Sequence, residues 1–154
     1  ATGKYFIQID AFSGNSYARP ANGYPDAIYM YGWSWAHSAS GTAQSWQPES
    51  ALPLVRVGDS FVYEGTCYVF SWAGDIAFIL TNPTGNTKVE LPNENFDANS
   101  NVLSGNPTHF SLPTTEGYYK ISVDLKDGVT IATSEPSTVT PNSNGKFALR
   151  YTLQ

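Results

Sequence analysis

The sequence predicts an all-β fold, an antiparallel β-sandwich of about eight strands formed by residues 1–154 as a single domain. Apolar and polar residues alternate in most segments, which places them on opposite faces of a strand. The chain also contains 13 Gly and 10 Pro, which interrupt it at short intervals, and no helical period persists between them. Frequent turns between short alternating segments indicate a sandwich, and an open barrel is the alternative.

Strands are expected where the alternation is clearest. In 118–126 the odd positions from Tyr119 onward are apolar and the even positions are polar. The Asp127-Gly128 pair that follows predicts a hairpin to the next strand, because Gly adopts positive φ without a Cβ clash. The expected strands are 5–10, 27–31, 61–70, 75–81, 118–126, 129–133 and 147–153. The expected loops are 13–25, 36–50, 82–113 apart from short strand pieces, and 136–145, with 1–25 forming an N-terminal strand and loop.

Composition excludes several classes of function. A net charge of −5, with only eight Lys and Arg, gives little material for the basic face that nucleic-acid binding requires. A neutral ligand is expected instead. No run of about 18 apolar residues is present to cross a bilayer. The single Cys67 has no internal partner and is expected to be buried. The first residues lack the pattern of a signal peptide, so we expect either that a signal was removed or that the chain is one module of a longer surface protein.

Aromatic residues outnumber charged ones, 22 (8 Phe, 4 Trp, 10 Tyr) against 21. Trp33 and Trp35 lie close together, and Trp46 follows after a loop of small and polar residues. Aromatic rings can stack on the C–H face of a sugar through dispersion and apolar burial. Trp33 and Trp35 are two residues apart, so an extended strand would direct both to one face, together with Tyr31. The patch therefore predicts a saccharide-binding platform.

Burial in the core is the competing interpretation of these rings. For Tyr29 and Trp33 both interpretations stay open, because large aromatic residues dominate protein cores. Trp46 stands between polar residues and is expected to be exposed. Trp72 lies at a turn, where it would form a second site or a lid on the sandwich. Hydrogen bonds to sugar hydroxyls are expected from Lys88, Arg56, and Asn82 or Asn86.

No catalytic group, cofactor or metal is expected. The acidic residues are scattered over strands and turns with no marked pair of the kind that glycoside hydrolysis needs. His37 and His109 have no zinc-ligand spacing, and the oxygen-rich run 93–101 lacks the glycine and terminal glutamate of an EF-hand loop. The histidines are expected to be polar loop residues, with His37 as a possible lining of the sugar site. The acidic residues considered for such a hydrolytic pair are Glu49, Glu64, Asp75, Glu90, Glu94 and Asp97.

Several segments occur in a familiar order, namely Ala-Ile-Tyr-Met-Tyr-Gly at 27–32, Trp46, Ala-Leu-Pro-Leu-Val-Arg at 51–56 and Phe-Val-Tyr-Glu-Gly at 61–65. Glu-Gly-Tyr-Tyr-Lys-Ile-Ser-Val-Asp-Leu at 116–125 completes the series. Over about residues 27–132 the chain resembles the SusE/SusF-like outer-membrane glycan-binding proteins of the Bacteroidetes, which consist of starch-binding-type β-sandwich modules. Each motif is short and of moderate specificity.

The resemblance implies a sandwich like that of carbohydrate-binding modules, which binds glycan at the bacterial cell surface and performs no chemistry. It implies that Trp46 occupies the family's turn tryptophan and that Tyr31 lies near the end of the first strand, where ring platforms occur. Expected partners are an oligosaccharide or polysaccharide and other outer-membrane proteins of glycan uptake. The alternative is a structural or protein-interaction domain of a cell-surface assembly, in which the tryptophans would be buried. A small glycoside hydrolase or lyase is the third and weakest candidate.

Overall fold

The computed structural model describes residues 5–9, 16–20, 25–80, 88–131, 139–143 and 145–154, and within them the predicted all-β fold is confirmed. No α-helix is present in these ranges; the helical elements are the short 3₁₀ turns η1 (Pro48–Ser50) and η2 (Asn93–Asn95). The strands are β1 (Tyr5–Ile9), β2 (Ser16–Pro20), β3 (Ala27–Gly32), β4 (Trp35–Ala36), β5 (Leu52–Arg56), β6 (Val62–Val69), β7 (Asp75–Ile79), β8 (Phe110–Ser111), β9 (Gly117–Asp124), β10 (Val129–Ile131), β11 (Val139–Pro141) and β12 (Ala148–Leu153).

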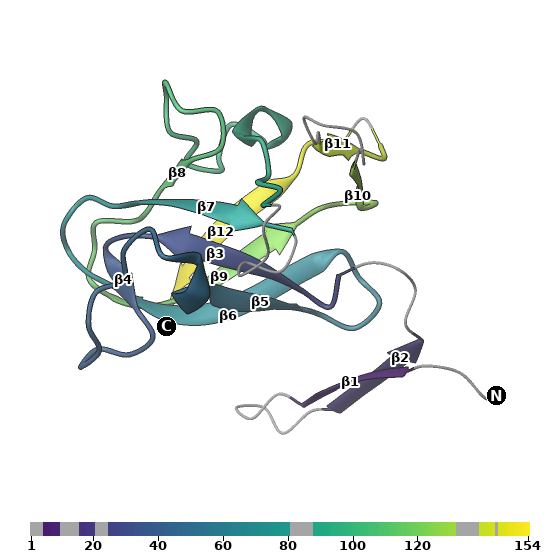
Figure 1. The fold of residues 1–154 in the computed structure, drawn as a ribbon, viewed down its shortest axis with the longest axis horizontal. Coiled ribbons are helices and arrows are strands. Elements are labelled where there is room, and N and C mark those ends of the chain that lie inside the picture. The colour runs from purple at the N-terminus through teal and green to yellow at the C-terminus, as the bar shows by residue number, and fades with distance from the viewer. Residues whose placement is uncertain (1–4, 10–15, 21–24, 81–87, 132–138, 144) are drawn as a thin grey trace.

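One eight-stranded antiparallel sheet forms the body of the protein. Its order is β12-β9-β6-β5-β3-β7-β8, and the short β4 pairs with the end of β6 on the edge that β5 also uses, opposite β9. The sheet curls strongly, so that β7 and β3 face β12 and β9 across a common interior in a sandwich-like arrangement (Figure 1). Alternating side chains of β6 and β9 are buried and accessible along their lengths, as expected for a sheet with one face in the core.

The segment 93–103 joins the two ends of this curled sheet. Phe96 forms a parallel bridge to Phe147 next to β12, and Val102 forms an antiparallel bridge to Phe110 of β8. The Ser100 Oγ accepts a hydrogen bond from the Leu149 amide at 3.0 Å. The segment therefore closes the gap between β12 and β8, the two terminal strands of the sheet, without forming a regular strand itself.

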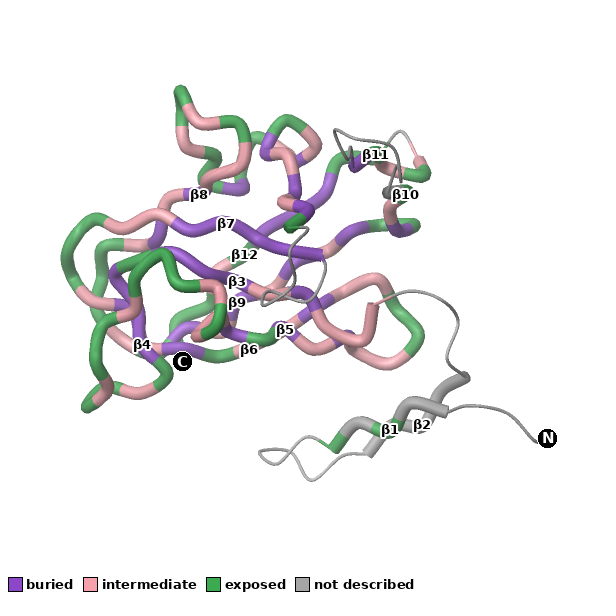
Figure 2. Tube along the Cα trace, viewed as in Figure 1, coloured by how far each residue is buried: buried purple, intermediate pink, exposed green. Residues whose placement is uncertain are grey.

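Phenylalanine rings run through the core from β7 to β12. Phe78 contacts Phe110 at a centroid distance of 5.4 Å, Phe110 contacts Phe96 at 4.6 Å, and Phe96 contacts Phe147 at 5.5 Å, all edge to face. Edge-to-face pairs contribute about 0.5–1.5 kcal/mol each beyond the burial of their area. Trp35 also lies in this core, with no exposed surface. Figure 2 shows that buried residues follow the strands of the curled sheet, while exposed ones concentrate in its connections.

Most expected strands are present, with small shifts at their ends. The predicted hairpin across Asp127-Gly128 is wrong, because β10 pairs with β11 and not with β9. Both edges of β9 are already paired, one with β6 and the other with β12. A turn does form there, with the Gly128 amide bonded to the Leu125 carbonyl at 2.9 Å, and it directs the chain into a separate two-stranded sheet.

A second small sheet consists of β1 and β2 alone, paired in a hairpin that lies to one side of the body in Figure 1. Ile7 and Ile9 are 67% and 75% exposed, and their spacing of two places them on one face of β1. Across the residues that the structure describes, no helix has the length and apolar character needed to cross a membrane.

Candidate functional site

The outer face of β3 and β7, opposite the core, brings several of the predicted residues together. In the antiparallel register Tyr31 lies opposite Ala77, and Tyr29 lies opposite Ile79, which is bridged in turn to Glu90. On the far side of β7, Asp75 pairs with Ser111. Opposed residues share a face of a sheet, so this face carries aromatic side chains on β3 and polar ones around β7 and β8. A small buried cluster of Tyr31, Ala77 and Ile79 forms its floor.

Trp33 is placed by a tight approach between two turns. Gly32 has a φ of +139°, and the Trp33 amide donates to the Asp75 carbonyl at 3.1 Å. A Cβ at Gly74 would lie 2.3 Å from the Ser34 Cβ, so only glycine allows the two turns to pack this closely. Ser34, at a φ of +72°, donates its hydroxyl to the Trp72 carbonyl at 2.7 Å. This packing leaves the Trp33 ring 41% exposed at the rim of the sheet.

Trp46 reaches the same face from the 36–50 loop. Its ring stacks on His109 at a centroid distance of 4.3 Å and an interplanar angle of 22°, and it meets Tyr31 edge to face at 5.0 Å. The side chain remains 36% exposed. Two ring contacts, one from β3 and one from the residue before β8, therefore hold a loop tryptophan in place while part of its surface stays accessible to solvent.

Two carboxylates lie among these rings, and neighbouring side chains donate to all four of their oxygens. Asp75 accepts from the Trp33 indole Nε1 on one oxygen, and its other oxygen lies 2.6 Å from the His109 Nδ1. Glu90 accepts from the Tyr31 hydroxyl on one oxygen and from the Thr108 hydroxyl on the other, the latter at 2.6 Å. We name Tyr31, Trp33, Trp46, Asp75, Glu90 and His109 together the Trp33–Trp46 site.

This network fixes which groups remain available for further hydrogen bonds. A carboxylate oxygen accepts in this contact, so the His109 Nδ1 is the donor to Asp75. Each carboxylate oxygen keeps a second lone pair. Burial, followed by the hydrogen bond to Glu90 and its charge, raises the pKa of Tyr31 well above its usual value, so Tyr31 remains a donor at neutral pH. The site can therefore accept hydrogen bonds from hydroxyl groups beside flat aromatic surfaces.

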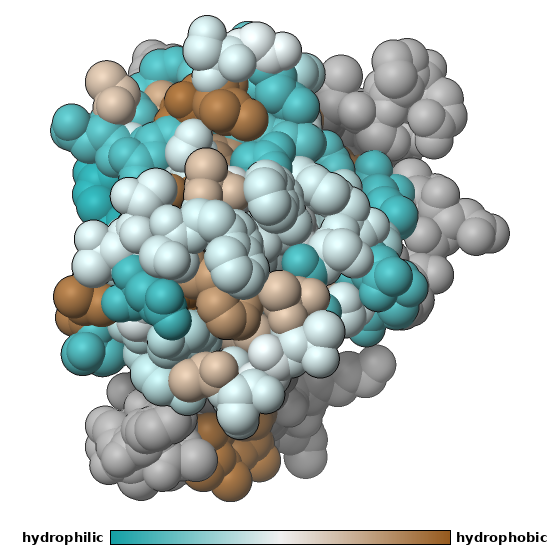
Figure 3. All heavy atoms as spheres, turned by 90° about the vertical axis from the view of Figure 1, so that its left-hand side faces the viewer, coloured by the Kyte–Doolittle hydropathy of each residue, from teal (hydrophilic) through white to brown (hydrophobic). Residues whose placement is uncertain are grey.

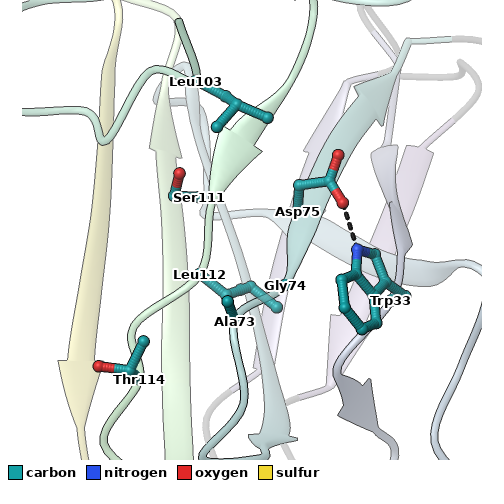
Figure 4. A pocket seen from close by; sticks show the side chains of 8 residues that line it. All are labelled: Trp33, Ala73, Gly74, Asp75, Leu103, Ser111, Leu112 and Thr114. Atoms are coloured by element: carbon teal, nitrogen blue, oxygen red, sulfur yellow. Dashed lines mark hydrogen bonds between the residues drawn. The ribbon is translucent and has the colours of Figure 1, made fainter.

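A shallow hollow of about 500 Å³ adjoins Trp33. In Figure 4 the Trp33 ring and the Asp75 carboxylate face each other on one side, and Leu103, Ser111, Leu112 and Thr114 border the other side. Ala73 and Gly74 complete the lining. The hollow combines an aromatic wall, apolar side chains and a few polar groups, as small-molecule sites commonly do.

Three of the predicted ligand-binding residues, Tyr31, Trp33 and Trp46, thus meet in one place. The expectation that Trp35 shares a face with Trp33 is wrong, because the positive φ of Ser34 interrupts the strand between them. Trp35 is fully buried and its ring contacts His37 at 5.1 Å, so it has no surface for a ligand.

The other predicted positions lie outside this site. Arg56 is 1% exposed; its guanidinium donates to the carbonyl groups of Asp59 and Ser60 and lies 5.1 Å from the Phe61 ring centroid. Its role is structural, and its burial excludes the predicted contact with sugar hydroxyls. Lys88 is exposed, Trp72 stacks on Phe70 in a different aromatic group, and Asn82 and Asn86 fall outside the described residues.

Sequence reasoning treated His109 as a loop polar residue and did not single out Asn93. Asn93 is 8% exposed, and its side-chain amide donates to the carbonyl groups of Asn106 and His109 at 2.5 and 3.2 Å. It thereby positions the backbone that carries His109. A buried side-chain amide that satisfies several carbonyls has no local sequence signature.

Within the described ranges, no group of three or more His, Cys, Asp or Glu side chains is arranged to hold a metal ion. Comparison with protein-family models, with curated proteins and with solved structures found no match for this chain. The function of the protein is therefore inferred from the chemistry of the Trp33–Trp46 site itself.

Proposed function

We propose that the protein binds a neutral oligosaccharide or polysaccharide, without chemical conversion, at the Trp33–Trp46 site. The observation that supports this most directly is the pair of partly exposed tryptophans, 41% and 36% accessible, beside hydrogen-bond acceptors on the same face. Indole rings take the C–H faces of pyranose rings, and acceptors between them take hydroxyl protons. Both tryptophans are held by polar or ring contacts before any ligand arrives, which reduces the entropy cost of binding.

The charge of the site favours a neutral ligand over an anionic one. Asp75 and Glu90 bring two carboxylates, and neither pairs with a lysine or arginine among the described residues. The chain as a whole carries a net charge of −5. A uronic acid or a sulfated sugar would meet repulsion here, whereas a neutral glycan would not.

Affinity electrophoresis tests the proposal. The protein is run through native gels that contain starch, barley β-glucan, xylan, mannan or fructan, beside Trp46→Ala and Trp33→Ala. Retardation by one polysaccharide is expected. Each substitution should reduce the binding free energy for that polysaccharide by about 1–3 kcal/mol, by analogy with bases stacked on aromatic residues. Wild-type mobility that is unchanged in every gel would remove the basis for the proposal. Release of reducing sugar from the retarding polysaccharide would contradict the non-catalytic part.

The setting that we propose is the bacterial cell surface, in a lipid-anchored or secreted protein that acts beside other glycan-uptake proteins of the outer membrane. Its support is the resemblance of residues 27–132 to the SusE/SusF-like modules. By this resemblance Trp46 corresponds to the turn tryptophan of those modules. Immunofluorescence of intact source cells, with and without surface proteolysis, would test this placement.

A protein-interaction role is a second candidate, favoured by the β1–β2 hairpin. Ile7 and Ile9 expose most of their side chains on one face of β1, and a hairpin with an uncovered apolar face offers a surface to a protein partner. Replacement of both isoleucines by Ser, followed by co-purification from source cells, should remove such a partner while saccharide binding persists.

A further inference from the structure

A second group of aromatic rings lies on the other half of the curled sheet. Tyr68 of β6 is directly opposite Tyr118 of β9 in the strand register, and their rings meet edge to face at 5.2 Å. Phe70 continues the row at 5.4 Å from Tyr68, and Trp72 stacks on Phe70 at 4.8 Å with an interplanar angle of 11°. We name these four residues the aromatic strip.

Two rings of the strip keep a large exposed surface. Trp72 is supported on one face by Phe70 and is 50% exposed, and Tyr118 is 42% exposed. The Phe70 stack covers one indole face, and half of the Trp72 surface remains accessible. Polar groups border the strip: the Tyr68 hydroxyl donates to Glu116 at 2.5 Å, and the Tyr118 hydroxyl accepts from the Ala39 amide at 3.2 Å. No acceptor for the Tyr118 hydroxyl hydrogen is found among the residues that the structure describes, so this hydrogen can be donated to a ligand.

The size of the strip fits a sugar better than a protein. Half of a tryptophan and two fifths of a tyrosine amount to roughly 200 Å² of exposed ring, since an aromatic side chain offers about 150–250 Å². A stable protein interface covers about 800 Å² on each partner. Figure 3, which views the end of the molecule with the β6–β7 connection, shows its strongly hydrophobic residues in small separate patches among polar and intermediate ones.

The strip is separate from the Trp33–Trp46 site but adjoins it. The Trp72 carbonyl accepts the Ser34 hydroxyl at 2.7 Å, and Ser34 follows Trp33 directly. Trp33 is turned toward Asp75 by its indole hydrogen bond, whereas Trp72 is turned toward Phe70. The two turns that pack against each other at Gly74 therefore carry one exposed tryptophan each. Trp33 belongs to the Trp33–Trp46 site, and Trp72 belongs to the aromatic strip.

We propose that the aromatic strip is a second saccharide-stacking platform, which binds another segment of the same neutral polymer as the Trp33–Trp46 site. The inference rests on the proposed function. Two platforms on one domain convert the second contact into an intramolecular event, so a long polymer should be held more tightly than a short fragment that reaches only one.

The test compares Trp72→Ala, Trp46→Ala, the double variant, Trp72→Phe and the control Ile9→Ala in gels that contain starch, barley β-glucan, xylan, mannan or fructan. Each single Ala variant should lower the apparent affinity for the retarding polysaccharide about tenfold, within the range for loss of one stacking ring. The double variant should show no retardation. Trp72→Phe should keep most of the wild-type retardation, and Ile9→Ala should match the wild type. Circular dichroism and urea midpoints confirm that each variant is folded.

Other patterns separate the two proposals. Retardation that is weakened by Trp46→Ala and is unaffected by Trp72→Ala would overturn the second platform while the proposed function stands. Retardation that depends on Trp72 alone would support the strip and overturn the Trp33–Trp46 site. No retardation of the wild type in any gel would overturn both. A wild-type dimer that Trp72→Ala converts to a monomer in sedimentation velocity would assign the strip to self-association and overturn the saccharide platform.

Discussion

The stack of Trp46 on His109 can be tested in the free protein by a double-mutant cycle. With Trp46 36% exposed, about two thirds of the ring surface, roughly 150 Å², is covered. At about 25 cal/mol per Å² this corresponds to an upper limit of about 4 kcal/mol. Relaxation of the loop and the contacts that an alanine keeps should reduce the loss in Trp46→Ala to about 2 kcal/mol.

The coupling between the two residues is the decisive quantity. A stacked pair contributes about 0.5–1.5 kcal/mol beyond its area. The loss in free energy of unfolding of the double variant Trp46→Ala, His109→Ala should therefore be smaller than the sum of the two single losses by about that amount. Urea unfolding followed by far-UV circular dichroism measures each free energy. The control cycle pairs His109→Ala with Trp72→Ala, whose side chains share no ring contact, and should be additive within about 0.5 kcal/mol. Equal coupling in the two cycles would refute the described geometry of the site.

Three further predictions concern the residues around the site. Trp35→Ala should cost about 3–5 kcal/mol of stability as a core truncation, whereas Trp35→Phe should cost far less, because it also removes an indole N–H that has no acceptor among the described residues; equal losses in urea unfolding would contradict this. Asn93→Ala should lose about 1–3 kcal/mol through unpaired buried carbonyls and should weaken polysaccharide retardation through displacement of His109, an effect that Asn99→Ala, at an exposed position, should lack. Burial raises the pKa of the Cys67 thiol from 9.0 to about 12, so the thiol should resist DTNB at pH 8 until the protein unfolds. Because the folded pKa is the higher one, the contribution of the neutral thiol to stability is complete below about pH 9 and is lost as the pH rises toward 12.

The fold could be predicted because its signal is local. Alternation in 118–126 and 147–153 identified β9 and β12, since side-chain direction in a strand depends only on position along it. Partners are not local, and the Asp127-Gly128 hairpin failed for that reason. Both edges of β9 were occupied by strands far away in the sequence.

The candidate site was predictable in its rings and not in its polar groups. Trp46 could be recognised from its polar flanks, and Trp33 from its place in an aromatic cluster. Trp35 could not be separated from Trp33, because a single positive φ at Ser34 decides which ring is buried. The contact of Asp75 with His109 joins residues 34 positions apart, and only the register of β7 against β8 brings them together.

The segment 93–103 affects whether the large sheet can pair with the sheet of another copy of the protein. A curled sheet that is not fully closed has free strand edges, and separate chains can pair edge to edge through them and aggregate. Here the amide of Asp97 bonds to the carbonyl of Phe147 beside β12, and the amide of Ser111 in β8 bonds to the carbonyl of Asn101. One connecting segment thus covers the start of one terminal strand and the whole of the other. The edge of β8 is therefore closed to a second copy of the domain, and pairing of the large sheet with another chain is restricted to the part of β12 that lies beyond its covered start.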